Sequence, residues 1–201
     1  MSKEVKGLNT NVSHEEEYSK VSLGFWVYLM TDCVLFASLF ATYLILQHNT
    51  NGGPGASELF SLPYVLIETL LLLTSSFTSG LAMLAVHRND KTKVLLWLFV
   101  TAVLGIAFLS MELTEFAALV HEGNSWTRSA FLSGYFTLVG THGLHIAAGL
   151  IWLTILGVLV AKRGMVASNV RRLSLFSMFW HFLDIVWIFI FTVVYLIGAL
   201  K

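Results

Sequence analysis

Cysteine, proline and charge are scarce in this sequence. Cys33 is the only cysteine among 201 residues, so the chain can form no internal disulfide and does not reveal its redox compartment. The only prolines, Pro54 and Pro63, lie outside the interior of every long apolar segment. Charged residues make up 12% of the chain, against about 25% in a soluble domain. The net charge is zero, so no overall basic field draws nucleic acid.

Common catalytic motifs are also missing. The chain has no CxxC pair, no CxxCH site for covalent haem, no glycine-rich phosphate loop and no GxSxG nucleophile. Its first residues, MSKEVKGLNTNVSHEEEYSK, are polar and lack the apolar core of a secretory signal peptide. We therefore expect residues 1–21 to form a disordered cytoplasmic tail.

Long apolar segments are what the chain has in abundance, because 56% of its residues are hydrophobic. A stretch of about 18 or more apolar residues predicts a membrane span. Five such segments occur, at residues 22–47, 63–87, 92–120, 129–161 and 173–200. Each must be helical, since hydrocarbon offers the backbone no hydrogen-bond partner. The sequence thus predicts an all-α, polytopic membrane protein with one five-helix domain over residues 22–201.

The basic residues predict the orientation of these spans. One side of a five-span topology would hold Lys3, Lys6, Lys20, Arg88, Lys91, Lys93, Lys162, Arg163, Arg171 and Arg172. The other side would hold only Arg128 and Lys201. Positive residues collect on the cytoplasmic side of membrane proteins. We therefore expect a cytoplasmic N-terminus and a periplasmic C-terminus.

Several ionisable residues fall inside the predicted spans, where they are costly and mark candidate functional sites. They are Asp32, Glu68, Glu112, Glu115, His142, His145, His181 and Asp184. Three successive spans each carry a pair spaced i, i+3, which is the spacing of ligands in di-iron helical bundles. The helical rise, however, spreads these pairs over about 20 Å of membrane depth. One shared metal site is therefore not expected.

Structural roles compete with functional ones for each pair. Glu112 and Glu115 lie near the predicted outer boundary, where they could face water or headgroups. His142 and His145, in the run THGLH, are predicted to donate hydrogen bonds between helices. His181 and Asp184 could neutralise each other, with Trp180 and Trp187 as part of their packing. The sequence shows no obvious partner for Asp32 on its own helix, and this residue should be protonated, or paired across helices, if it is buried.

Four segments carry a family resemblance: FWHFLDIVWIFIFTVVYLIG, VGTHGLHIAAGLIW, SMELTEF and GFWVYLMTDCVLFASLFATY. They resemble the signature helices of subunit III of haem–copper respiratory oxidases, in the short five-helix bacterial form. The resemblance covers residues 22–200, and WHFLDIVW together with THGLH carries most of it. The loop GGPGASELFSLP and the run GFWVYLMTDCVLFA look most similar to the cytochrome bo-type ubiquinol oxidases.

The resemblance implies a role in aerobic respiration. Such complexes oxidise ubiquinol, reduce oxygen to water and pump protons across the bacterial inner membrane. Haem and copper belong to subunit I, so no catalytic residue, metal ligand or redox centre is expected in this chain. The chain would stabilise subunit I, hold phospholipid in an interhelical cleft and associate with subunits II and IV. Two other classes compete: an autonomous proton or ion transporter that uses the buried carboxylates and histidines, and a membrane metalloenzyme or haem-handling protein.

Overall fold

The structure, a computed structural model, describes residues 2–53, 55, 59 and 61–199. In this part of the chain it has five helices long and apolar enough to cross a membrane, and no strand. They lie in α1 (Ser2–Leu46), α3 (Leu62–His87), α4 (Lys91–His121), α5 (Ala130–Arg163) and α6 (Ala167–Ile190). The chain then continues as a π-helix, η1 (Phe191–Leu196), and a short α7 (Ile197–Ala199). The predicted class, all-helical with five potential spans, is confirmed.

The helix bounds differ from the predicted spans by a few residues at most ends. The stretch of α1 that can cross a membrane begins at Ser19, although α1 itself begins at Ser2. The division into a polar tail over residues 1–21 and a membrane domain stays a prediction. The α6 helix begins at Ala167, ahead of the predicted residue 173, because its first turns are polar and give no hydropathy signal.

Local signals set several helix ends. The Asp90 carboxylate accepts a hydrogen bond from the Lys93 backbone N–H and caps α4. The Ser129 hydroxyl accepts one from the Leu132 N–H and caps α5. Gly164 follows α5 with a φ of 73°, a left-handed conformation that glycine adopts without strain. The turn from α5 to α6 is therefore short, and the two helices are antiparallel neighbours.

The contacts divide the chain into two units, Met1–Leu35 and Phe36–Lys201. In the first unit α1 is the described element, and the rings of Phe25 and Tyr28 lie 5.9 Å apart between centroids. The Thr31 hydroxyl donates to the Tyr28 carbonyl oxygen at 2.7 Å. This is the usual way in which a helix satisfies a threonine hydroxyl in an apolar setting.

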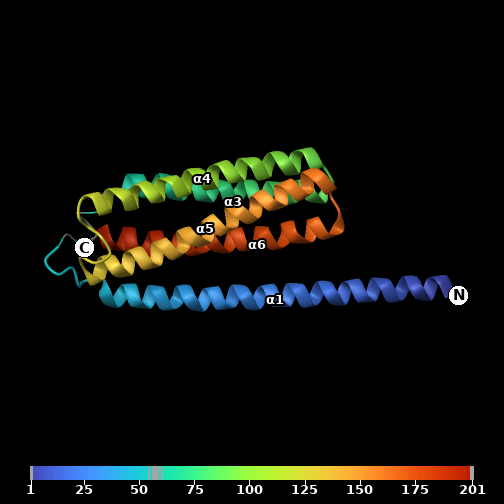
Figure 1. The fold of residues 1–201 in the computed structure, drawn as a ribbon, viewed down its shortest axis with the longest axis horizontal. Coiled ribbons are helices and arrows are strands. Elements are labelled where there is room, and N and C mark those ends of the chain that lie inside the picture. Colours follow the sequence, from blue (N-terminus) through green and yellow to red (C-terminus); the bar gives the residue numbers. More distant parts are fainter. Residues whose placement is uncertain (1, 54, 56–58, 60, 200–201) are drawn as a thin grey trace. The chain divides into compact units, whose positions relative to one another are not determined.

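In the second unit α3, α4, α5 and α6 form a closed ring of neighbours. The helix pairs α3–α4, α4–α5, α5–α6 and α3–α6 are all in contact, and α3 and α4 lie side by side (Figure 1). The part of α1 that belongs to this unit packs on α5, where the rings of Tyr43 and Phe131 lie 6.1 Å apart. A Cβ atom at Gly134 would lie 3.6 Å from the Tyr43 Cα atom, so glycine permits this close approach.

Two tryptophans on α6 form the centre of this ring. Trp180, which is 1% exposed, donates from its indole N–H to Ser75 Oγ on α3 at 3.0 Å. Trp187, which is 0% exposed, donates to Thr69 Oγ1 on α3 at 3.1 Å. The acceptor positions decrease along the chain as the donor positions increase, so α3 and α6 are antiparallel. Each indole thus ties two helices together by a hydrogen bond that is shielded from water.

The two indole rings also contact the remaining helices of the ring. A Cβ atom at Gly105 on α4 would lie 3.1 Å from the Trp180 ring, and one at Gly149 on α5 would lie 2.9 Å from it. These two glycines therefore provide the space for Trp180. The Trp187 ring lies 4.7 Å from Phe108 on α4, almost perpendicular to it. Both tryptophans were expected to pack around the pair His181 and Asp184, but their main contacts are across the bundle.

Candidate functional site

Glu112 lies inside the bundle, against the THGLH motif. Its side chain is 1% exposed, so it does not face water or headgroups as one reading of the sequence proposed. A Cβ atom at Gly143 would lie 2.6 Å from Glu112 Oε1 and 3.1 Å from its Cδ, so a side chain there would require the carboxyl group to shift. Oε2 is buried without a hydrogen-bond partner. The central residue of THGLH therefore accommodates a carboxyl group from α4.

A second carboxyl group on α4, that of Glu115, is hydrogen-bonded to tyrosine. The Tyr195 hydroxyl on η1 donates to Glu115 Oε2 at 3.2 Å. Tyr195 and Tyr135 on α5 share a further hydrogen bond of 3.0 Å between their hydroxyls. This chain of three side chains links α4, α5 and the π-helix. Both tyrosines are 0% exposed, and sequence reasoning did not connect either of them with the glutamates.

Glu68 on α3 is the third buried glutamate. It is 0% exposed, and neither carboxyl oxygen has a hydrogen-bond partner among the described residues. It interacts electrostatically with Glu115 and Glu112 on α4. An isolated, ionised carboxylate without hydrogen bonds is very costly in such a place. The cluster formed by Glu68, Glu112 and Glu115 is thus a concentration of carboxyl groups without a basic partner in the described part of the chain.

His142 is packed as an aromatic ring. It is 0% exposed, and its ring stacks on Trp187 with centroids 5.2 Å apart and an interplanar angle of 30°. The ring of Phe108 meets it edge-on at 6.1 Å. Neither ring nitrogen of His142 has a hydrogen-bond partner among the described residues. The predicted interhelical hydrogen bond is therefore wrong for His142, because aromatic side chains occupy the positions around its ring.

The structure also places the four remaining ionisable residues that the sequence singled out, namely His145, His181, Asp184 and Asp32. His145 is hydrogen-bonded through Nδ1 to the Thr141 carbonyl oxygen of its own helix at 2.7 Å, and its ring lies 5.2 Å from Phe36. His181 shares a 2.6 Å hydrogen bond with Ser76 Oγ on α3, and the same serine is hydrogen-bonded to Asp184, so Ser76 connects the two residues of the predicted pair. Asp184 is buried, and its Oδ1 has no partner in the described part of the molecule. Asp32 is buried on α1 in the first unit and is hydrogen-bonded to Tyr28, so a partner on its own helix exists after all.

The arrangement offers no metal-ligand set. Among the described residues there is no group of three or more His, Cys, Asp or Glu side chains that could hold a metal ion. The helical rise alone placed Glu112 at a different depth from the THGLH motif, but the Glu112 carboxyl group lies against Gly143 of that motif. The described part of the chain therefore provides no set of three or more such ligands for a metal ion.

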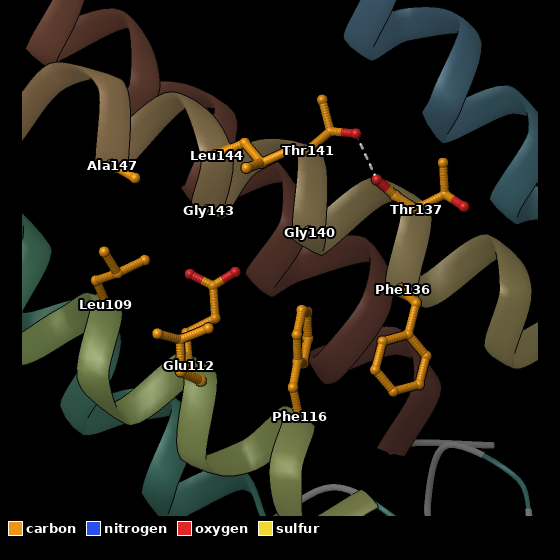
Figure 2. A pocket seen from close by; sticks show the side chains of 11 residues that line it. Leu109, Glu112, Phe116, Phe136, Thr137, Gly140, Thr141, Gly143, Leu144 and Ala147 are labelled. Atoms are coloured by element: carbon orange, nitrogen blue, oxygen red, sulfur yellow. Dashed lines mark hydrogen bonds between the residues drawn. The ribbon is translucent and has the colours of Figure 1, made fainter. Parts of the chain in front are cut away.

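A groove of about 450 Å³ lies between α4 and α5, beside this cluster. Its α4 wall is formed by Leu109, Glu112, Leu113 and Phe116, and its α5 wall by residues between Phe136 and Ala147. Figure 2 shows the Glu112 side chain directed from α4 toward α5, with the two phenylalanines at one end of the groove. The groove is thus mainly apolar and has one carboxyl group in its wall.

The fold and the buried residues define a class: a polytopic helical-bundle membrane protein with carboxyl, tyrosine and histidine side chains buried inside the bundle. Comparison with known proteins identifies the family. Residues 5–199 match the model of cytochrome c oxidase subunit III, so the chain belongs to this family. As a member of it, the chain is a multi-pass membrane protein.

The similar proteins are named as subunit 3 of ubiquinol, cytochrome c or quinol oxidases. The chain is 55% identical to the cytochrome bo(3) ubiquinol oxidase subunit 3 of Pseudomonas aeruginosa, over 94% of this chain and 93% of that protein. It is 53% identical to the cytochrome c oxidase subunit 3 of Bacillus sp. strain PS3, over 88% and 85%. It is 43% identical to the quinol oxidase subunit 3 of Bacillus subtilis, over 94% of both proteins.

Proposed function

We propose that the chain is the non-redox subunit III of a terminal ubiquinol oxidase. One observation carries the proposal: the near full-length, 55% identity to a protein named as subunit 3 of a ubiquinol oxidase. In this role the chain contributes to an enzyme that oxidises ubiquinol and reduces oxygen to water with proton translocation. The chain itself supplies packing surfaces and no catalytic group.

Its partners in the proposal are subunit I, which holds haem and copper, together with subunits II and IV. The described residues support this division of labour, because they offer no ligand set for a metal. The bundle contributes stability instead. Its exposed apolar side chains, such as Leu144 and Phe99, lie on the outside of α5 and α4 and suit contact with lipid or with other subunits. Phospholipid retained between helices is part of the proposed role.

We further propose a bacterial inner-membrane location with the N-terminus in the cytoplasm. Seven basic residues lie in the turns between α3 and α4 and between α5 and α6 or in the helix ends beside them, whereas the loop between α4 and α5 has only Arg128. A Cys33→Ser chain with a new cysteine at Thr127 should react with an impermeant maleimide on intact spheroplasts. One with a new cysteine at Ser2 should react only after permeabilisation. The opposite pattern would reverse the orientation.

The test of the function is purification of the tagged chain from its native membrane. We expect recovery with a large haem-bearing partner, visible in the absorption spectrum and as a stoichiometric complex by native mass spectrometry. A tagged, unrelated membrane protein of similar size controls for nonspecific recovery. Isolation of the chain as a self-sufficient homo-oligomer that moves protons alone in proteoliposomes would favour the transporter alternative and reject the proposal.

A further inference from the structure

The groove between α4 and α5 has the chemistry of a binding site for a small amphiphile. It encloses about 450 Å³, and it lies between two helices that each expose apolar side chains beside it, Leu113 on α4 and Leu144 on α5. An interhelical groove with apolar walls and a few polar groups is a common form of ligand site. The α5 wall projects little into the groove, because it includes the small residues Gly140, Gly143 and Ala147.

One polar group in this groove is unpaired and deeply buried. Glu112 is 1% exposed and lines the groove, and its Oε2 has no hydrogen-bond partner among the described residues. The other polar side chains of the lining are already committed: the Thr137 hydroxyl donates to the Ser133 carbonyl oxygen, and the Thr141 hydroxyl donates to the Thr137 carbonyl oxygen. Figure 2 shows the second of these bonds on α5, on the side of the helix away from Glu112. A buried carboxyl group without a partner is costly, and a ligand that bonds to it would remove that cost.

The lining also excludes a phosphate-bearing headgroup as the group recognised here. No lysine or arginine lines the groove, and headgroup phosphates are normally bound by basic residues. Glu112 lies six residues from the middle of Lys91–His121, which is about 9 Å at the helical rise. It is therefore deeper than the headgroups of a core about 30 Å thick. The ligand must carry its hydrogen-bonding group into the hydrocarbon.

Aromatic side chains complete the groove. The rings of Phe116 and Phe136 lie 4.8 Å apart at one end of it, next to the carboxyl group. Flat rings favour the edge or face of another ring. A neutral ring with hydroxyl or carbonyl groups and an apolar tail satisfies all of these features, because the ring lies against phenylalanine, the hydroxyl bonds to Glu112 and the tail lies along leucine.

We propose that the α4–α5 groove binds a membrane-dissolved quinol, with Glu112 as its hydrogen-bonding partner. The inference rests on the proposed function, which makes a quinol the substrate of the complex. It assigns binding only and no electron transfer. Such a site would hold substrate at the surface of subunit III, where quinol diffuses through the bilayer.

The test uses the purified complex and a photoreactive short-chain ubiquinone. Haem content is measured first, since loss of the haem-bearing partner would refute the proposed function, whereas an intact complex without label in this chain would refute only the groove. After irradiation and peptide mapping, we expect label in Leu109–Phe116 or Phe136–Ala147. Excess ubiquinol should abolish this label, and phosphatidylethanolamine should not.

Two matched pairs of variants test the position and the chemistry. Ala147→Phe fills the groove and Ala148→Phe adds the same ring to the adjacent, exposed position, so labelling should fall about tenfold in the first and stay unchanged in the second. Glu112→Leu removes the proposed hydrogen bond to the quinol, whereas Glu112→Gln keeps a side chain that can form it. Only Glu112→Leu should therefore weaken labelling by about tenfold.

Equal labelling in both members of either pair would overturn the proposal. Displacement of the probe by phospholipid would identify the groove as an acyl-chain site instead. Crosslinks from the groove to a neighbouring subunit would show that protein covers it. The competition measurement needs no variant, so the proposal stays refutable even if Ala147→Phe prevents assembly.

Discussion

Replacing Gly149 by alanine should destabilise the bundle through a single contact. The new Cβ atom would lie 2.9 Å from Cζ3 of Trp180 and 3.2 Å from Phe179. Trp180 has little freedom to move away, because its indole N–H is bonded to Ser75 and its opposite side meets Gly105. Overpacking of this kind costs about 1–3 kcal/mol. Alanine also gains up to about 1 kcal/mol over glycine in helix propensity, which partly hides the cost.

Gly157 supplies the matched control on the same helix. A Cβ atom there would meet nothing within 4 Å, so Gly157→Ala gains the helix propensity without the contact. The difference in unfolding free energy between the two variants should therefore be about 1–3 kcal/mol. Titration of the purified chain with SDS in mixed micelles, followed by circular dichroism, measures it. If both variants unfold within about 0.5 kcal/mol of each other, the close packing of Trp180 against α5 is not a constraint.

Three further outcomes follow from single contacts. A double-mutant cycle of Trp187→Phe and Thr69→Val should give a coupling energy of about 0.6–1.5 kcal/mol in SDS unfolding, from the indole hydrogen bond, and zero coupling would contradict it. His142→Phe should leave stability unchanged or raise it by about 1 kcal/mol, because both ring nitrogens are buried without partners, and a clear loss of stability would show that they are bonded. Hydrogen bonds from Lys93 hold the pKa of Asp90 below its usual value. This stabilisation is therefore present at neutral pH and is lost as the pH falls through the lowered pKa. Asp90→Ala should lower the Tm at pH 7 and flatten its decline in acid, and an unchanged thermal scan would contradict this.

The sequence predicted the helical architecture well because membrane spans leave a strong physical trace. Hydrocarbon demands long apolar helices, and five of them are evident from composition alone. The N-terminal turns of α6 were missed because they contain Asn169, Arg171 and Arg172, which carry no apolar signal.

The contacts of the polar residues were much harder to predict. Spacing places two side chains on one helix face, but it does not tell which other helix that face meets. The role of Gly143, for example, depends on the Glu112 carboxyl on another helix. Tyr195 could not be assigned to Glu115 because a π-helix turn determines where its hydroxyl lies. Such contacts between helices depend on how the helices pack against each other, which the spacing within one helix does not determine.

The positions of Trp180 and Trp187 at the centre of the bundle have a consequence for biogenesis. Both indoles belong to α6, the last of the five spans to leave the ribosome, and their partners lie on α3, α4 and α5. The three helices that carry these partners can insert one by one as independent spans. The shared centre of the bundle, however, cannot form until translation is nearly complete. A ribosome that stalls before Trp180 would leave α1, α3, α4 and α5 inserted, with Gly105, Gly149, Ser75 and Thr69 uncovered, and would expose this unfinished protein to the membrane's quality control.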